Sequence, residues 1–236
     1  MHLRKITLFP EKYPAKDCYP FNLHNFHITR LIAFNTPVTF FVGENGTGKS
    51  TLIEAIARRC NIHIWEPVEE RRFELNRYEE ELYRFISVEW TDGVVPGSFF
   101  ASAIFQHFTN ILDQWAVASP KVLDYFGGKS LMTQSHEQCH MSYFKSRFQK
   151  KGLYLLDEPE NALSPKTQLE LLNVLEDVGQ NGHAQFIIAT HSPILLALPD
   201  ATIYSFDHAP VQQIRYEDTS HYQIYKKFLN DRDTHM

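Results

Sequence analysis

The sequence predicts an α/β fold in which a mostly parallel sheet forms the core and a helical subdomain is inserted into it. Apolar runs typical of buried strands alternate with runs of helical spacing, which is the pattern of a sheet with crossover connections. Three of the strand-like runs lead directly into residues suited to phosphate or metal chemistry, at positions 43–51, 157–158 and 191. Because parallel strands end at one shared edge, we expect these positions to meet there.

The composition fits a globular chain with a sizeable core. Of the 236 residues, 43% are hydrophobic, and the formal net charge is −5. This negative charge argues against a general nucleic-acid coat but leaves a local basic patch open. Three scattered cysteines, Cys18, Cys60 and Cys139, form no disulfide framework, so we expect a cytoplasmic location. We expect neither a signal peptide, because the start has no apolar core, nor a membrane span.

We expect residues 1–236 to form a single domain whose core is interrupted once. The strand and helix pattern of the core covers residues 1–60 and returns at 151–236. Residues from about 61 to 150 differ in character, because they are first highly charged and then rich in aromatic residues at helical spacing. They are expected to form the helical subdomain.

The first part of the core begins with a strand at Leu3–Leu8. Residues 9–36 are rich in Pro, Asn and His, and they predict a loop with short strand pieces. Val38–Val42 is a continuous apolar run, as expected for a buried strand of a parallel sheet. A helix from Lys49 to about Cys60 is expected to follow it.

The expected subdomain contains three helical segments. Glu66–Ile86 carries apolar residues at helical spacing, and Val94–Ser98 breaks the pattern with a Pro and a Gly. Phe99–Val117 predicts a mostly buried helix, and we interpret its aromatic residues at 99, 100, 105 and 108 as core rather than as a base-stacking surface. After a turn at Gly127–Gly128, Glu137–Lys150 predicts the third helix.

The second part of the core resumes the alternation of strands and helices. Gly152–Asp157 predicts a strand, and Pro165–Val178 predicts a helix whose proline suits a first helical turn. Gln185–Thr190 and Ala201–Phe206 predict two further strands, and Ser220–Leu229 predicts a last helix.

The most specific motif is the segment after the first buried strand: Gly43, Glu44, Asn45, Gly46, Thr47, Gly48, Lys49, Ser50 and Thr51. It matches the phosphate-binding P-loop pattern G-x-x-x-x-G-K-[ST]. A Gly-rich turn can fit this pattern by chance, but here a strand precedes it and a helix follows it, as the mechanism requires. The glycines let backbone N–H groups face an anion, Lys49 can reach the β- and γ-phosphates, and the Ser50 hydroxyl can hold Mg²⁺.

The ends of two later strands add further parts of a nucleotide site. Asp157 can bind the Mg²⁺ shell, and Glu158 can orient or deprotonate a water molecule that attacks the γ-phosphate. Acidic residues often end strands as solvated caps, but their place after a complete P-loop favours the chemical interpretation. His191 follows the next strand and can hydrogen-bond the γ-phosphate, although a lone histidine at a strand end is usually structural.

The order of the P-loop, LLDEP and THSP resembles that of the ABC-type ATPases. The chain is similar to the short soluble AAA family ATPases of the SMC and DNA-repair branch over FFVGENGTGKSTLIEAIA, GLYLLDEPENALSP, QFIIATHSPILLA and YEDTSHYQIYKKFL. This resemblance implies Walker A and Walker B motifs, ATP and Mg²⁺ as ligands, and hydrolysis of ATP to ADP and phosphate. It implies metal ligation by Ser50 and Asp157, catalytic roles for Glu158 and His191, and a homodimer that forms on ATP binding.

The resemblance also implies that each subunit completes the site of the other. Residues 160–163 stand in the place of the D-loop, which touches the opposite subunit. Ser135 begins the signature segment, which caps the γ-phosphate held by the partner subunit. Glu137 stands where the family has a glycine, and a one-residue deletion is another way to align the segment. We therefore expect ATP turnover to be slow or dependent on a partner.

Two further family features are left open by the sequence. The aromatic residue that stacks on adenine is one of four candidates, Tyr13, Tyr19, Phe21 and Phe26. Gln106 is a candidate for the glutamine that joins the sheet to the helical subdomain.

A competing motif lies inside the signature segment. Residues 136–140 read His-Glu-Gln-Cys-His, the H-E-x-x-H pattern of zinc metallopeptidases, with Glu137 as general base and Glu160 as a possible third ligand. The segment coincides with the expected signature, and Glu160 directly follows the strand end that the ATP site uses. A five-residue pattern also arises easily in a chain with 12 histidines, so we rank this hypothesis below ATP hydrolysis.

Two main functional classes follow from the sequence. The first is an ATP-gated dimeric switch that acts on a partner protein or nucleic acid, in DNA repair or phage defence, with any effector encoded elsewhere. The alternative is the ATP-binding subunit of a membrane transporter, which would normally show a full LSGGQ-like signature and a clear coupling glutamine. We interpret the basic cluster Lys145, Arg147, Lys150 and Lys151 as a solvated helix face rather than as a DNA site.

Overall fold

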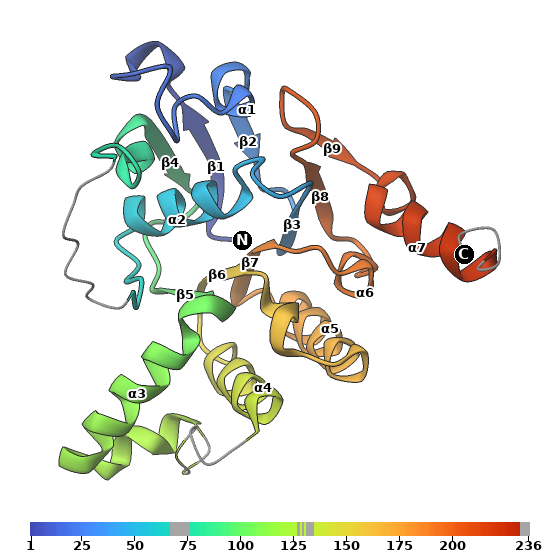
Figure 1. The fold of residues 1–236 in the computed structure, drawn as a ribbon. Coiled ribbons are helices and arrows are strands. Elements are labelled where there is room, and N and C mark those ends of the chain that lie inside the picture. The colour runs from blue at the N-terminus through green and yellow to red at the C-terminus, as the bar shows by residue number, and fades with distance from the viewer. Residues whose placement is uncertain (67–75, 127, 129, 131–134, 232–236) are drawn as a thin grey trace.

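The computed structural model describes residues 1–66, 76–126, 128, 130 and 135–231 (Figure 1). Its core is a six-stranded sheet in the order β5-β6-β7-β3-β8-β9. Five of these strands are parallel: β3 (Val38–Val42), β5 (Gly97–Ala101), β6 (Gly152–Asp157), β7 (Ala184–Ala189) and β8 (Thr202–Ser205). The edge strand β9 (Gln212–Ile214) is antiparallel to β8. The predicted α/β fold with a mostly parallel sheet is confirmed.

A second sheet has three antiparallel strands in the order β2-β1-β4, and the sequence did not predict it. β1 (Leu3–Leu8) lies between β2 (Leu31–Ala33) and β4 (Ile86–Trp90) and pairs antiparallel with both. The short helix α1 (His24–Ile28) precedes β2 in the segment expected to be mostly loop. β4 lies in the expected helical subdomain, directly after the helix expected at Glu66–Ile86, and forms a strand by pairing with β1.

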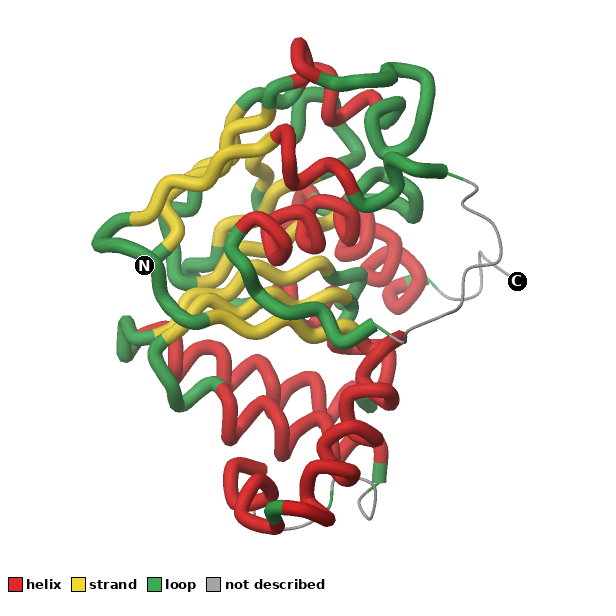
Figure 2. Tube along the Cα trace, turned by 90° about the vertical axis from the view of Figure 1, so that its left-hand side faces the viewer, coloured by secondary structure: helices red, strands yellow, loops and turns green. Residues whose placement is uncertain are grey.

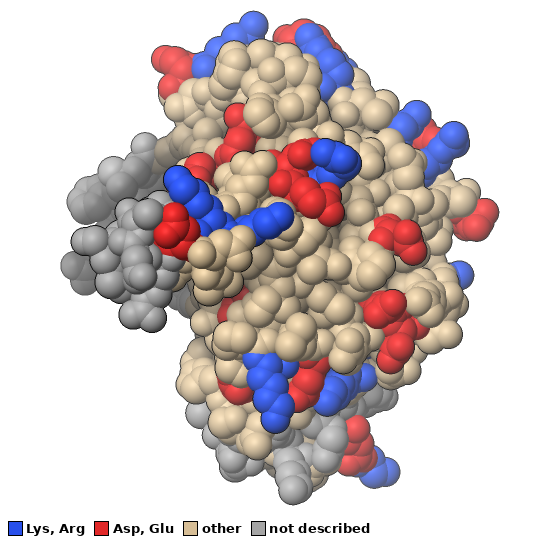
Figure 3. Space-filling model, turned by 90° about the vertical axis from the view of Figure 1, so that its right-hand side faces the viewer, with Lys and Arg blue, Asp and Glu red and all other residues tan. Residues whose placement is uncertain are grey.

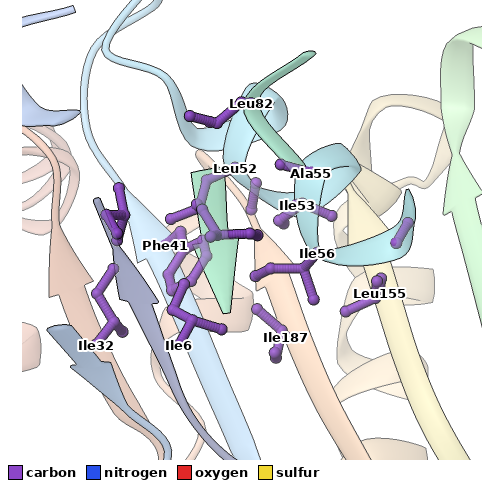
Figure 4. Close-up of a cluster of buried hydrophobic side chains, with 14 of the residues drawn as sticks. Ile6, Ile32, Phe41, Leu52, Ile53, Ala55, Ile56, Leu82, Leu155 and Ile187 are labelled. Carbon is purple, nitrogen blue, oxygen red and sulfur yellow. The ribbon is translucent and has the colours of Figure 1, made fainter. Parts of the chain in front are cut away.

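Helix α2 (Lys49–Arg59) lies between the two sheets (Figures 1 and 4). One buried cluster joins Leu52, Ile53 and Ile56 of α2 to both sheets, with Ile6 and Ile32 on one side and Phe41, Leu155 and Ile187 on the other. Because the helix is apolar on both of these sides, burial fixes its position and with it the loop at its N-terminus.

The opposite face of the six-stranded sheet is covered by α3 (Ser102–Ala118), α4 (His136–Arg147) and α5 (Pro165–Gln180), as Figure 2 shows. A second buried cluster joins the sheet residues Phe40, Leu156 and Phe186 to helix residues such as Phe144 and Leu175. The chain ends with α6 (Pro193–Leu196) and α7 (Ser220–Asn230) beside this layer. The main sheet is therefore covered on both faces, as its continuous apolar strands require.

The segment from 61 to 150 is only partly helical. It supplies β4 to the small sheet and β5 to the large one, and the described part of the helix expected at Glu66–Ile86 forms turns and a 3-10 helix at Glu81–Phe85. Residues 67–75 of that expected helix, and residue 127 of the expected turn, lie outside the described residues. Phe99 and Phe100 lie in β5 and pair in register with β6, so α3 begins at Ser102. All four residues of the aromatic stripe are buried, as expected.

Seven predicted elements match the structure within a few residues, namely β1, β3, α2, β6, α5, β7 and α7. α4 and β8 are also present, and each is shorter than expected. Among the described residues, no helix is both long and apolar enough to cross a membrane.

The central position of Leu155 gives a stability test. Leu155 is 0% exposed on β6, whereas Leu169 on α5 is 53% exposed. We expect Leu155→Ala to lower the free energy of unfolding by about 2–5 kcal/mol, because it leaves a cavity against α2. The matched change Leu169→Ala should alter it by less than about 0.5 kcal/mol. Urea denaturation measures both, and equal effects of the two changes would contradict the proposed core.

Candidate functional site

The carboxyl ends of four neighbouring strands meet at one edge of the large sheet (Figure 1). Backbone hydrogen bonds tie the residues that follow these strands: Glu158 N donates to Ala189 O at 2.9 Å, and Thr190 N donates to Phe41 O at 3.1 Å. Phe206 N donates to Val42 O at 2.8 Å. The P-loop, Glu158 and His191 are thereby brought to one place, which is where ligands bind in open α/β sheets.

The P-loop turns directly into the buried helix α2. Gly48 is the N-cap of α2. Its backbone φ angle is +100°, a value that residues other than glycine rarely adopt. A Cβ at Gly48 would lie 2.8 Å from the Phe26 ring, so a larger residue would also collide with the core. The loop N–H groups and the helix N-terminus together form a concave site suited to phosphate.

Lys49 is the cation of this loop and is only 4% exposed. Its Nζ donates to Gly43 O at 2.7 Å and to Glu44 O at 2.9 Å, so the ammonium group lies along the inside of the loop. Burial lowers the pKa of Lys49, and the carboxylates of Glu158 and Asp157 oppose this effect. A phosphate group at the loop would supply a further negative charge to this ammonium.

Ser50 and Asp157 join the P-loop to β6. Ser50 Oγ donates to Asp157 Oδ1 at 2.9 Å, so a hydroxyl and a carboxylate oxygen are paired at the sheet edge. Burial raises the pKa of Asp157 to about 6, and burial with the nearby Asp157 charge raises that of Glu54 to about 7. Among the described residues no group of three or more His, Cys, Asp or Glu side chains could hold a metal by itself. A serine and one aspartate fit Mg²⁺, which proteins bind with few carboxylates plus phosphate oxygens and water.

Glu158 has an uncommon backbone conformation. Its φ of 47° and ψ of 54° lie in the left-handed region, which costs a residue with a side chain about 1 kcal/mol or more. Glu158 Oε2 accepts a hydrogen bond from Asn161 Nδ2 at 2.6 Å, and Glu158 Oε1 lies 3.5 Å from His191 Nε2. The turn thus directs the carboxylate toward His191, next to the strand end that carries Asp157.

His191 is held by two groups besides its own strand. Its backbone N–H donates to Glu160 Oε1 at 2.6 Å, and its Nδ1 lies 2.9 Å from Nε2 of His221 on α7. Burial raises the pKa of Glu160 and, together with Lys49 and His221, lowers the pKa of His191. The imidazole is therefore favoured in its neutral form, with one N–H to donate.

The aromatic candidates for adenine stacking separate clearly by burial. Tyr13, Phe21 and Phe26 are at most 7% exposed and pack in the core, whereas Tyr19 is 39% exposed. The Tyr19 hydroxyl lies 2.7 Å from Thr51 Oγ1, immediately beside the loop. Tyr19 is therefore the one of the four whose ring is accessible. Gln106 bonds to Thr109 and Asn110 on its own helix.

The signature segment forms the start of α4. Ser135 is the N-cap, and Gln138 completes a capping box with it. Glu137 Oε1 accepts a hydrogen bond from the backbone N–H of Ser164, and Glu137 Oε2 accepts one from Thr167 Oγ1 at 3.2 Å. The carboxylate that replaces the family glycine therefore binds the N-terminus of α5, where it also complements the helix dipole.

The H-E-x-x-H residues do not form a zinc site. His140 is 3% exposed, and its ring centroid lies 4.4 Å from that of Phe105 within a cluster of aromatic rings. Burial lowers the pKa of His140 to about 4. Glu137 and Glu160 are both engaged by backbone N–H groups. His140 is therefore a core residue of α4.

Two family models match parts of the chain. One, described as "AAA domain, putative AbiEii toxin, Type IV TA system", matches residues 145–197, and one described as "AAA domain" matches residues 21–58. Together these segments contain the P-loop, Asp157, Glu158 and His191. No curated protein sequence matches the chain.

Solved structures resemble the chain over nearly its whole length. The SMC head domain from Thermotoga maritima is 17% identical, with a TM-score of 0.51, and the match covers 91% of this chain and 100% of that one. The SmcHead bound to the C-winged helix domain of ScpA is 11% identical with a TM-score of 0.54, covering 92% and 99%. CbiO1 from Clostridium perfringens, part of the ABC transporter complex cbiONQ, is 18% identical with a TM-score of 0.51, covering 98% and 97%.

The chain has the fold of the ABC and SMC ATPase heads. This result confirms the resemblance inferred from the motifs. At these low identities it establishes the fold of the chain, whereas the site rests on the residues themselves.

Three residues of the site were missed or differently placed by sequence reasoning. Asp207 follows β8 and accepts a hydrogen bond from Glu44 N at 2.7 Å, so its position after a parallel strand was an available signal. Glu160 binds the backbone of His191, which spacing could not reveal. His221 reaches the site from α7, 30 residues beyond His191; it lies in the quoted segment YEDTSHYQIYKKFL, to which sequence reasoning assigned no role.

The raised pKa of Asp157 gives a test of the metal position. Its ordinary value is 3.8, and burial raises it to about 6, so the ionised side chain should lower stability by up to about 3 kcal/mol above pH 6. This penalty shrinks as the pH falls from about 6 toward 3.8, because the folded protein takes up the proton before the unfolded chain does. We therefore expect Asp157→Asn, without nucleotide or Mg²⁺, to be more stable than the wild type at pH 7.5 and to keep only about half of that advantage at pH 5.

Urea denaturation in a chelating buffer measures this difference at both pH values. Asp177→Asn on the exposed side of α5 is the control and should change the free energy of unfolding by less than about 0.5 kcal/mol at either pH. A loss of stability for Asp157→Asn at pH 7.5 would show that the buried carboxylate is compensated by other groups.

Proposed function

We propose that this chain binds ATP with Mg²⁺, hydrolyses it, and uses ATP to join two copies into a dimer that acts as a switch on a partner protein. The observation that carries the proposal is the paired Ser50 hydroxyl and Asp157 carboxylate between the P-loop and β6. Next to this pair lie a buried lysine, a carboxylate and an imidazole, the groups that phosphoryl transfer to water requires.

The proposed roles follow from where each group lies. The P-loop N–H groups and Lys49 bind the β- and γ-phosphates, and Tyr19 lies where it can contact the adenine. Ser50 and Asp157 would hold Mg²⁺, which supplies positive charge to the phosphate oxygens when bound. Glu158 orients and deprotonates the attacking water, while Asn161 holds one of its carboxylate oxygens. His191 donates its Nε2–H to the γ-phosphate.

The dimer is proposed because, in the family that the motifs resemble, a second subunit covers the γ-phosphate. In the family, that cover is the signature segment of the partner subunit. Here Ser135 and the N-terminus of α4 are exposed, and the Glu137 carboxylate is turned away from them onto Ser164 and Thr167. This arrangement supports a role for the Ser135 end of α4 in spite of the missing glycine.

A protein is the partner that the surface supports best. An apolar groove of about 840 Å³ lies between α5, α6 and α7 and reaches Glu160 and His191 at the site. On the α7 side of the molecule, Lys and Arg are interspersed with Asp and Glu (Figure 3), and Lys145 of the basic cluster lies 3.7 Å from Glu170. One structure of similar fold is described as bound to a winged-helix domain of another protein, and one matching family description names a toxin system. The first description supports action on a partner protein, and the proposed role in DNA repair or phage defence is carried over from the motif resemblance.

The P-loop assignment is tested by Lys49→Ala. We expect this change to weaken ATP binding at least about 100-fold, because it removes charge-assisted hydrogen bonds to two phosphates. Isothermal titration with ATP and Mg²⁺ measures the affinity, and thermal melting checks that the variant is folded. Lys166→Ala, at the start of α5, is the control and should bind ATP as the wild type does. Unchanged ATP affinity in a folded Lys49→Ala protein would refute the assignment.

The switch is tested by Glu158→Gln. We expect hydrolysis to slow by about 10²- to 10⁴-fold, because the general base is lost while the nucleotide contacts remain. The variant should therefore accumulate as an ATP-bound dimer, seen by size-exclusion chromatography with light scattering. The double variant Lys49→Ala with Glu158→Gln is the control and should stay monomeric. A monomer for Glu158→Gln at saturating ATP would remove the dimeric switch.

A further inference from the structure

His221 contributes a second imidazole to the site from α7, an element to which sequence reasoning assigned no role. It is the second residue of α7, and its Nε2 lies 2.9 Å from Nδ1 of His191. α7 itself has no buried residue, although the cap residue Thr219 before it is 1% exposed. The contact between the two imidazoles is a polar link from this helix to the sheet edge.

At this distance one of the two nitrogens must carry a proton, because two lone pairs would repel each other. Burial lowers the pKa of both imidazoles, and Lys49 adds to this effect, whereas Glu158, Glu44 and Asp207 oppose it. Each neutral ring has a single N–H. The choice of donor in this one contact therefore sets the tautomer of both rings.

The surroundings favour one of the two arrangements. If His221 Nε2–H donates, then His191 carries its proton on Nε2, which lies 3.5 Å from the Glu158 carboxylate. In the opposite arrangement, the lone pair of His191 Nε2 would face that carboxylate. This nitrogen is shielded from solvent and has no hydrogen-bond partner among the described residues, so water cannot relieve the repulsion.

The remaining nitrogen of His221 fits the same arrangement. Its Nδ1 lies 3.4 Å from Ser220 Oγ, and a serine hydroxyl can donate to a bare imidazole nitrogen. The protons then point in one direction: from Ser220 to His221, from His221 to His191, and from His191 toward Glu158. Ser220 and His221 each donate forward to an acceptor, and the last N–H, on His191 Nε2, is left directed toward Glu158.

We propose that His221 is a positioning residue, which fixes His191 as the Nε2–H tautomer and so keeps a donor directed at the γ-phosphate. The catalytic part of this proposal rests on the proposed ATPase function, whereas the tautomer itself does not. A partner that orients a histidine in this way is typically worth about 10- to 100-fold in activity. His221 belongs to the same subunit as His191, so this contact needs no second copy.

The tautomers are measured directly by two-bond ¹⁵N–¹H correlation spectra of the nucleotide-free protein at pH 7.5. The signals of the two rings are assigned by their loss in His191→Gln and His221→Gln. We expect Nε2–H for both rings in the wild type. An Nδ1–H tautomer at His191 would overturn the proposal, and this result does not depend on ATP binding.

The effect on turnover is measured with two variants of one residue. His221→Phe keeps the ring but loses the donor, so kcat should fall about 10- to 100-fold, while ATP affinity stays within about threefold of the wild type. His221→Gln supplies an amide N–H at a similar place and should recover most of the rate. Gln223→Phe, on the exposed face of α7, should behave as the wild type.

Wild-type kcat in His221→Phe, or no recovery in His221→Gln, would overturn the positioning role. Failure of the ATPase function itself has a different signature, because the wild type would then bind no ATP while the tautomer result remains. The two outcomes are therefore distinguishable.

Discussion

The burial of α2 between two sheets is the constraint on which the site depends. Leu52, Ile53 and Ile56 pack toward both sheets, so the helix has little freedom to move (Figure 4). Its first residue is Lys49, and its N-cap is Gly48 in a backbone conformation that few other residues adopt. The packing of the helix thus holds an ammonium group and a helix N-terminus at the sheet edge, where Lys49 and Ser50 also contact the loop and Asp157.

The ammonium group of Lys49 lies among several carboxylates, and the positive and negative charges at this edge only partly balance. Lys49 is surrounded by carboxylates from three strand ends, and the raised pKa of Asp157, Glu54 and Glu160 reflects the burial of these acids. A divalent cation and a polyphosphate would bring charges of both signs to this place. The site is therefore electrostatically suited to a metal–nucleotide pair more than to either ligand alone. The proposed requirement for ATP together with Mg²⁺ follows from this local balance.

The sequence predicted the parallel sheet and the placement of its functional loops because those features are local. An apolar run of about five residues predicts a strand that is buried on both faces. The glycines of the loop after it let backbone N–H groups face an anion. It failed for β4 and β5, because Ile86–Trp90 and Gly97–Ala101 become strands only by pairing with β1 and β6. It failed likewise for Glu160 and His221, whose roles depend on contacts across the fold. Glu137, at the position where the family has a glycine, leads to the expectation of slow or partner-dependent turnover. In the structure its carboxylate binds Ser164 and Thr167.

Helix α7 connects the candidate nucleotide site to the molecular surface, because it contacts His191 at one end and lines the groove. The helix has no buried residue, and three of its apolar side chains, Ile224, Tyr225 and Leu229, are more than half exposed. Its N-terminal end touches His191, and its other face lines the groove that α5 and α6 complete. A helix that packs weakly along its length but is hydrogen-bonded at the catalytic end is easily displaced by small changes there. If His191 changes its acceptor when the γ-phosphate leaves, the same hydrogen bond would transmit that change to α7, which lines the groove. A switch of this kind needs no long-range rearrangement of the sheet, which the packed core resists.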